Sequence, residues 1–123
     1  MTDKLLVMGC GTWGSALAHS LSSNSHRVTM WHYDEMKLLG FKSTRLHPNL
    51  LNFEFNKAIN FKYDLKESVE TSNIIVLAVP SSAVRGVINK IKSYLNENHI
   101  IVITSKGLEP KTFFTMSEVV YDE

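Results

Sequence analysis

The chain has little of several residue types that mark special classes of protein. One cysteine in 123 residues allows no internal disulfide and is typical of a reducing compartment. No stretch approaches the roughly 18 consecutive apolar residues of a membrane span, and the N-terminus has no apolar core of signal-peptide length. Thirteen basic and twelve acidic residues leave a net charge of +1 without a basic stripe for nucleic acid. We therefore expect a cytoplasmic globular protein with no membrane span and no nucleic-acid partner.

Metal-ligand spacing is also lacking. His19 and His26 have no second histidine or cysteine at a suitable distance along the chain, so no metal site is predicted. The length lies within the usual range of one domain, and neither repeats nor low-complexity segments divide it. The expected organisation is a single domain over residues 1–123.

Short apolar runs alternate with helical patterns along the whole chain, with short links between them. We expect strands at Lys4–Met8, Arg27–His32, Ile59–Lys62, Asn73–Val79 and Ile100–Thr104. We expect helices at Thr12–Ser23, Asp34–Lys42, Leu65–Glu70 and from Pro80 to about Leu95, with an irregular connection over Ser43–Lys57. This order predicts a doubly wound α/β fold, in which helices cover both faces of a mainly parallel sheet.

The first turn carries the strongest motif. Gly9, Gly11 and Gly14 form G-x-G-x-x-G between an apolar run and a helical pattern. The first glycine allows a sharp turn, the second allows a pyrophosphate to approach the backbone, and the third allows the helix to pack closely. The free N–H groups of a helix beginning near Thr12 then face the anion. The motif predicts dinucleotide binding by a Rossmann-type domain.

A second candidate site follows the second expected strand. Asp34 lies about twenty residues beyond the glycines, where an acid grips the ribose of NAD, but it also suits the N-cap of the next helix. If the strand ends at Trp31, the ribose position falls to His32, which is not an acid. His32 and Tyr33 stack on adenine or tolerate a 2′-phosphate, unless they are merely exposed.

Two further segments follow later strands. Pro80 makes a rigid strand-to-helix corner, where Ser81 or Ser82 is expected to cap the helix. Lys106, before Gly107, either offers a fixed positive charge to a carbonyl oxygen or phosphate, or is one solvated lysine.

Other residues near the glycine turn have simpler interpretations. Trp13 either packs under the sheet or flanks a nicotinamide. Cys10 is expected to be a small packing residue, because no neighbouring residue suggests an activating base. The buried face of the first helix is expected to carry Ala16, Leu17 and Leu21.

Four motifs in order resemble one known family. They are Gly9–Ala18, Val28–Trp31, Ala78–Ser81 and Ser105–Glu109. Together they resemble the N-terminal domain of bacterial NAD(P)-dependent glycerol-3-phosphate dehydrogenase, and the resemblance covers essentially the whole chain. It implies a cytoplasmic enzyme that interconverts dihydroxyacetone phosphate and sn-glycerol 3-phosphate by hydride transfer and feeds phospholipid synthesis.

The resemblance also implies roles for single residues. Thr12 and Trp13 contact the cofactor, NAD or NADP. Lys106 touches both the nicotinamide and the substrate and is the candidate catalytic residue. Tyr33 stands where the family often has Arg or His near the adenosine phosphate, which argues against a strong preference for NADPH.

Family members are much longer than this chain. Their second, all-helical domain carries the principal catalytic lysine and the groups that bind the phosphate of the small-molecule substrate. We therefore expect the 123 residues to bind the dinucleotide only and to form a homodimer. Two alternatives are a stand-alone regulatory NAD-sensing domain and the cofactor domain of another two-domain dehydrogenase.

Overall fold

The chain folds around one parallel β-sheet. The computed structural model describes residues 3–123, with the strands in the order β3-β2-β1-β4-β5 and all neighbouring pairs parallel. The strands are β1 (Lys4–Met8), β2 (Arg27–Trp31), β3 (Asn60–Phe61), β4 (Ile74–Leu77) and β5 (Ile100–Ile103). The helices are α1 (Thr12–Ser23), α2 (Glu35–Thr44), α3 (Leu65–Glu70), α4 (Val84–Ile91) and α5 (Met116–Asp122), and the 3₁₀ turns η1 (Ser81–Ala83) and η2 (Lys92–Tyr94) flank α4.

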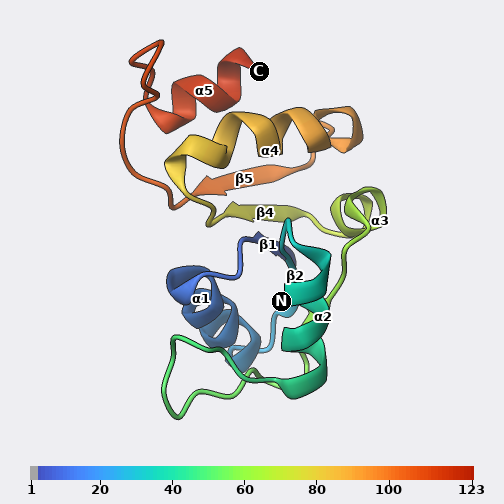
Figure 1. Cartoon of the computed structure of the whole chain (residues 1–123). Helices are drawn as coiled ribbons and strands as arrows, with labels where there is room; N and C mark the ends of the chain where they lie inside the picture. The colour runs from blue at the N-terminus through green and yellow to red at the C-terminus, as the bar shows by residue number, and fades with distance from the viewer. Residues whose placement is uncertain (1–2) are drawn as a thin grey trace.

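The helices lie on both faces of the sheet, as predicted. The strand order reverses between β1 and β4, so the crossovers on the two sides of this point place their helices on opposite faces. In Figure 1, α4 and α5 lie above β4 and β5, while α1 and α2 lie below the sheet. The predicted doubly wound α/β fold is confirmed.

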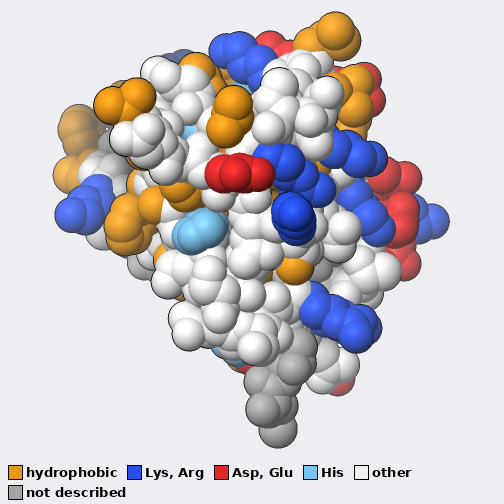
Figure 2. Space-filling view, turned by 90° about the horizontal axis from the view of Figure 1, so that it is seen from below, with side chains coloured by type: hydrophobic (Ala, Val, Ile, Leu, Met, Phe, Trp, Pro, Cys, Tyr) orange, Lys and Arg blue, Asp and Glu red, His pale blue; other side chains and the backbone are white. Residues whose placement is uncertain are grey.

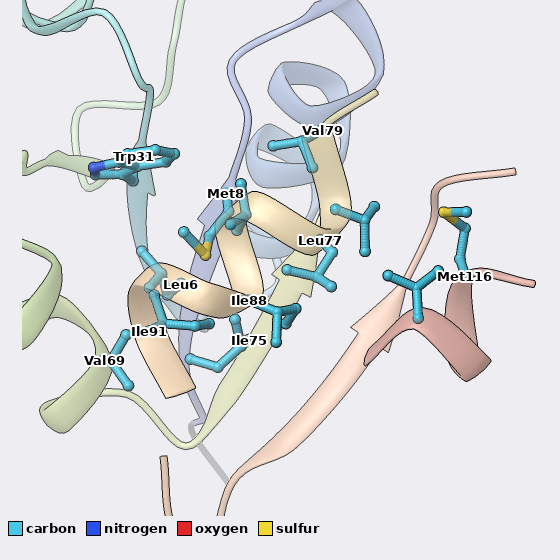
Figure 3. Packing of buried hydrophobic residues seen from close by; sticks show 13 residues of the cluster. Leu6, Met8, Trp31, Val69, Ile75, Leu77, Val79, Ile88, Ile91 and Met116 are labelled. Atoms are coloured by element: carbon cyan, nitrogen blue, oxygen red, sulfur yellow. The ribbon is translucent and has the colours of Figure 1, made fainter. Parts of the chain in front are cut away.

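The alternation of side chains along β1 divides the core between the two faces. Leu6 and Met8 face α4 and α5, and Figure 3 shows them beside Ile75, Leu77 and side chains of α4. The intervening residues of β1 face the other way and pack with β2 and α2. The buried residues of β1 and β4 are all apolar because helices cover both faces of the sheet.

Two predicted boundaries around β4 are wrong. The strand ends at Leu77 rather than Val79, because the chain leaves the sheet there and turns toward α4. The expected continuous helix from Pro80 is divided into η1, α4 and η2. Neither Ser81 nor Ser82 caps it, since the Ala83 N–H instead donates to the Pro80 carbonyl at 2.8 Å in a 3₁₀ turn.

The predicted buried face of α1 is partly wrong. Ala16 is exposed, and Leu17 and Leu21 are only partly buried. The fully buried positions are small residues, including Ser15 and Ala18. Small side chains allow the helix axis to lie close to the sheet, and a periodic count of large apolar residues does not detect such a face.

Helix α5 was not predicted, although its start has a recognisable signal. The Thr115 hydroxyl accepts the Glu118 N–H at 3.3 Å, and the Glu118 carboxylate accepts the Thr115 N–H at 3.1 Å. This reciprocal pair is a capping box, which the spacing Thr-x-x-Glu encodes. Met116 and Val119 bury the inner face of the helix against α4.

The irregular connection between α2 and β3 is held in place by tertiary contacts. Arg45 ends α2 in the left-handed conformation, and its guanidinium donates to the Ile59 carbonyl at 2.7 Å. The Phe55 N–H donates to the Arg45 carbonyl at 2.7 Å, and the Phe55 ring is buried. The segment therefore forms a fixed wall beside α2.

In residues 3–123, no helix is both long enough and apolar enough to cross a membrane. The lower face of the molecule, seen head-on in Figure 2, carries basic and acidic side chains side by side, together with scattered hydrophobic ones.

Candidate functional site

A crevice of about 420 Å³ lies at the carboxyl edge of the sheet, where the strand order reverses. In Figure 1 this edge is on the left, where α1 and α4 begin. Ligands of open parallel sheets bind at such a switch point. The lining residues are Gly9, Cys10, Gly11, Thr12, Trp13, Gly14, His32, Tyr33, Ala78, Val79, Pro80, Thr104 and Ser105.

Two glycines of the turn are required by the fold itself. Gly9 has φ +118°, and a Cβ there would lie 2.6 Å from the Ala78 carbonyl oxygen. A Cβ at Gly14 would collide with the backbone of Gly9. Any side chain at either position would separate α1 from the sheet.

Gly11 differs from both, because no protein contact demands a glycine there. Its backbone is extended, with φ −70°, and no protein atom lies within 4 Å of a Cβ built at this position. Gly11 lines the crevice, so the open space beside it is available to a ligand. This agrees with the predicted approach of a pyrophosphate to the backbone.

The N-terminus of α1 is also unlike those of its neighbours. Helices α2, α3 and α5 each have a side-chain cap and an acidic residue in the first turn. Helix α1, whose N-cap is Gly11, has neither. Helix α4 also has neither, but it continues directly from the 3₁₀ turn η1. Its N-terminal N–H groups and positive dipole end therefore remain available for an anion in the crevice.

The structure decides between the two interpretations of Asp34 in favour of the N-cap. Its carboxylate accepts the N–H groups of Met36 and Lys37 at 3.1 and 3.2 Å.

Strand β2 ends at Trp31, so His32 occupies the position at which the sequence predicts a ribose contact. Burial lowers the pKa of His32 below its ordinary 6.5, and its Nδ1 accepts the Asp34 N–H at 2.9 Å. Burial therefore favours the neutral imidazole of His32.

Two aromatic side chains are exposed at the crevice. Tyr33 is 67% exposed and stacks on His32 with a centroid distance of 4.6 Å. Trp13 is 61% exposed, so the alternative in which it packs under the sheet is wrong. Thr12 is also exposed at the start of α1. Flat ring faces at this edge suit the planar rings of a dinucleotide.

Cys10 is a packing residue, as expected. Burial raises the pKa of its thiol to about 12, and Sγ lies 3.7 Å from the Trp31 carbonyl oxygen. A neutral, buried thiol has no nucleophilic role at physiological pH.

The far wall of the crevice comes from the end of β5. The hydroxyl groups of Thr104 and Ser105 donate to the carbonyl groups of Leu77 and Val79, which holds this wall against the end of β4. Lys106 follows immediately, but its side chain is exposed and does not line the crevice. Within residues 3–123 it makes no ion pair.

The segment after Lys106 turns sharply and is held by an ion-pair cluster. Gly107 has φ +113°, a conformation that L-residues rarely adopt. The Arg85 guanidinium then donates to both carboxylate oxygens of Glu109 at 2.7 and 2.9 Å. The same guanidinium donates to Asp122 at 2.7 Å and Glu123 at 3.1 Å. Arg85 thus joins α4, the segment after Lys106 and α5.

A second crevice, of about 400 Å³, adjoins the first and shares Cys10, Gly11 and His32 with it. Its walls include Lys37 of α2 and the buried His47 of the following segment. Neither residue was predicted from the sequence. Lys37 is one of many exposed lysines, and a single histidine in an irregular connection has no spacing that marks a role.

The sheet, its switch point and the glycine turn define a dinucleotide-binding domain of the Rossmann type. Residues 4–123 match the family described as the N-terminus of NAD-dependent glycerol-3-phosphate dehydrogenase, and the chain belongs to this family. Membership confirms the family that the four sequence motifs resemble.

The chain is similar to glycerol-3-phosphate dehydrogenases (NAD(P)+) of bacteria. The enzyme of Fusobacterium nucleatum is 41% identical over an alignment of 125 positions, which covers 98% of this chain and 36% of that protein. The enzyme of a Thermoanaerobacter species is 39% identical over 117 residues, 95% of this chain and 36% of that protein. The chain thus spans about 36% of the length of these relatives.

A solved structure has a closely similar backbone. The glycerol-3-phosphate dehydrogenase of Coxiella burnetii matches 99% of this chain and 38% of its own, with a TM-score of 0.91 and 28% identity. The yeast enzyme matches 99% of this chain and 39% of its own at a TM-score of 0.81, and at 21% identity it shows the fold alone.

We predict that Glu109→Gln lowers the melting temperature at pH 7. Hydrogen bonds from Arg85 lower the pKa of Glu109 from 4.5 to about 2, so its carboxylate stabilises the folded state above about pH 4.5. That stabilisation is lost as the pH falls toward about 2, and the difference between wild type and variant should close over this range. Thermal unfolding measured from pH 7 to pH 2 tests this.

Glu97→Gln is the control, since Glu97 is exposed and makes no ion pair within residues 3–123. It should change the melting temperature little at any pH. A difference for Glu109→Gln that stays constant down to pH 2 would contradict the assigned ion pair.

Proposed function

We propose that this chain is the NAD(P)-binding domain of a glycerol-3-phosphate dehydrogenase. In the complete enzyme, it would present the nicotinamide for hydride transfer between dihydroxyacetone phosphate and sn-glycerol 3-phosphate. This proposal places the enzyme in the cytoplasm, in the supply of glycerol phosphate for phospholipid synthesis, and as a homodimer. Family membership and the similarity of nearly the whole chain to bacterial relatives support it.

The observation that carries the proposal is the contrast among the three glycines. Gly9 and Gly14 are explained by contacts within the protein, whereas Gly11 lines open space beside an uncapped helix N-terminus. A pyrophosphate fits both features, because it needs close approach to the backbone and accepts several N–H groups. The residues present therefore fit a bound dinucleotide.

Each end of the crevice then has a distinct role. His32 and Tyr33 lie at the end of β2, where they would contact the adenosine. Trp13 and the end of β5 would border the nicotinamide, which supplies the hydride when bound. Lys106 would extend its ammonium group over this end and contact both nicotinamide and substrate.

The first test is the affinity of Gly11→Val for NADH and NADPH. The isopropyl group would occupy the path of the pyrophosphate and remove hydrogen bonds to a charged group. The affinity should fall about 100-fold or more, which corresponds to about 3 kcal/mol. Isothermal titration calorimetry or NADH fluorescence measures it.

Gly86→Val is the matched control. Gly86 lies in α4, has no protein atom within 4 Å of a built Cβ, and does not line the crevice. The Gly86→Val variant should bind NADH and NADPH with the affinity of wild type. A folded Gly11→Val variant with unchanged affinity would refute the pyrophosphate assignment.

The second test concerns the choice of cofactor. His32 is not an acid and does not repel a 2′-phosphate, and Tyr33 offers it no positive charge, so wild type should discriminate only modestly. Tyr33→Arg should shift the affinity ratio toward NADPH by about tenfold or more, because guanidinium binds phosphate through paired hydrogen bonds. Tyr33→Gln, which adds no charge, should leave the ratio near the wild-type value. Equal ratios for Arg and Gln variants would show that position 33 does not face the 2′-phosphate.

The third test is turnover by these 123 residues alone. Reduction of a ketone requires the carbonyl group to be polarised and protonated while the substrate is held in line with the nicotinamide. The residues that line the crevice include no lysine or arginine to hold a substrate phosphate. We therefore expect the chain to bind NADH but not to oxidise it when dihydroxyacetone phosphate is added. The absorbance of NADH measures this oxidation.

Lys106→Ala and Lys111→Ala separate the possible sources of any activity. Both lysines are exposed and lie in the same segment, but only Lys106 adjoins the crevice. Oxidation that disappears in Lys106→Ala and persists in Lys111→Ala would show that this domain catalyses the reaction by itself.

A further inference from the structure

A buried histidine lies directly behind the glycine turn. His47 is 6% exposed, and its Nε2 lies 2.8 Å from the Cys10 carbonyl oxygen. Its Nδ1 accepts the Asn49 N–H at 3.1 Å. A carbonyl oxygen only accepts and an amide N–H only donates, so the ring is neutral and carries its proton on Nε2.

The ring is fixed by packing as well as by hydrogen bonds. It stacks on Phe41 of α2 with a centroid distance of 5.4 Å and an interplanar angle of 4°. Phe55 lies at a centroid distance of 6.2 Å. An apolar side chain would also fill this space, so packing alone does not require an imidazole. The chemical requirement comes from the Cys10 carbonyl.

That carbonyl belongs to the peptide unit that precedes the helix. The unit between Cys10 and Gly11 is trans and planar, so its C=O and its N–H point in opposite directions. His47 holds the oxygen on one side, and the Ser15 hydroxyl reaches the same oxygen at 3.3 Å. The orientation of the Gly11 N–H is therefore set by the partner of the Cys10 oxygen.

We propose that His47 is a positioning residue for pyrophosphate binding. By holding the Cys10 carbonyl, it orients the Gly11 N–H and the first turn of α1 toward the dinucleotide. It also joins the irregular segment after α2 to the cofactor site, since the second ring nitrogen binds Asn49 of that segment. This inference rests on the proposed dinucleotide binding.

His99 provides a matched control within the same chain. Its Nε2 lies 2.9 Å from the Val69 carbonyl oxygen, and its Nδ1 accepts the Asn96 N–H at 3.0 Å. The pattern of hydrogen bonds is the same as at His47. His99 precedes β5, at the opposite edge of the sheet from the crevice. Replacing it removes equivalent bonds without touching the glycine turn.

The experiment compares His47→Leu and His99→Leu in the 123-residue chain. Three quantities are measured: the melting temperature, the NMR shift of the Gly11 amide without ligand, and the dissociation constant for NADH. Both variants should lower the melting temperature. His47→Leu alone should move the Gly11 amide and weaken NADH binding about three- to tenfold, the range expected for one hydrogen bond. His47→Gln, whose amide N–H can reach the same carbonyl, should recover part of the affinity.

The outcomes separate this inference from the proposed function. If wild type binds no dinucleotide, the proposed function fails and the inference fails with it. If wild type binds NADH and a folded His47→Leu leaves both the Gly11 amide and the affinity unchanged, only the inference is overturned. If His99→Leu weakened NADH binding as much as His47→Leu does, the inference would also be overturned. If His47→Leu does not fold, His47→Phe provides the same test. Its ring can still stack on Phe41, but it has no N–H to donate to the Cys10 carbonyl.

Discussion

The close approach of the first turn to the end of β4 is the contact on which the rest of the site depends. At Gly9 a Cβ would lie 2.6 Å from the Ala78 carbonyl oxygen, and at Gly14 it would meet the backbone of Gly9. Because no side chain intervenes, α1 begins directly over the carboxyl edge of the sheet. A wider separation would turn its N–H groups away from the switch point and open the crevice to water.

The helices differ in how their N-termini are satisfied, and the difference coincides with the site. Helices α2, α3 and α5 use Asp34, Asp64 and Thr115 as caps and thereby satisfy their own free N–H groups. Helix α1 has no such cap and faces the crevice. The local sequence therefore satisfies free N–H groups at three helices and leaves those of α1 available at the crevice. Helix α4 also lacks a side-chain cap, but it continues directly from the 3₁₀ turn η1.

Prediction from the sequence succeeded where the signal was local and failed where packing decided. The strand boundaries of β1 were correct because an apolar run and a glycine turn delimit it. The buried face of α1 was predicted wrongly, with Ala16 inside, because the pattern of apolar residues does not mark it. The positions that pack on the sheet include small polar residues such as Ser15. The continuous helix after Pro80 was wrong because a 3₁₀ turn satisfies the N–H group that a serine cap was expected to bind.

By itself, the sequence determined the order of the five strands and the first four helices, the doubly wound class and the phosphate-binding turn. Each of these follows from apolar periodicity or from the conformational freedom of glycine within a few consecutive residues. Only the tertiary structure decided that His47 meets Cys10 and that Arg85 meets Glu109. These pairs are 37 and 24 residues apart along the chain. No local pattern encodes such contacts, since they depend on how separate segments pack around the sheet.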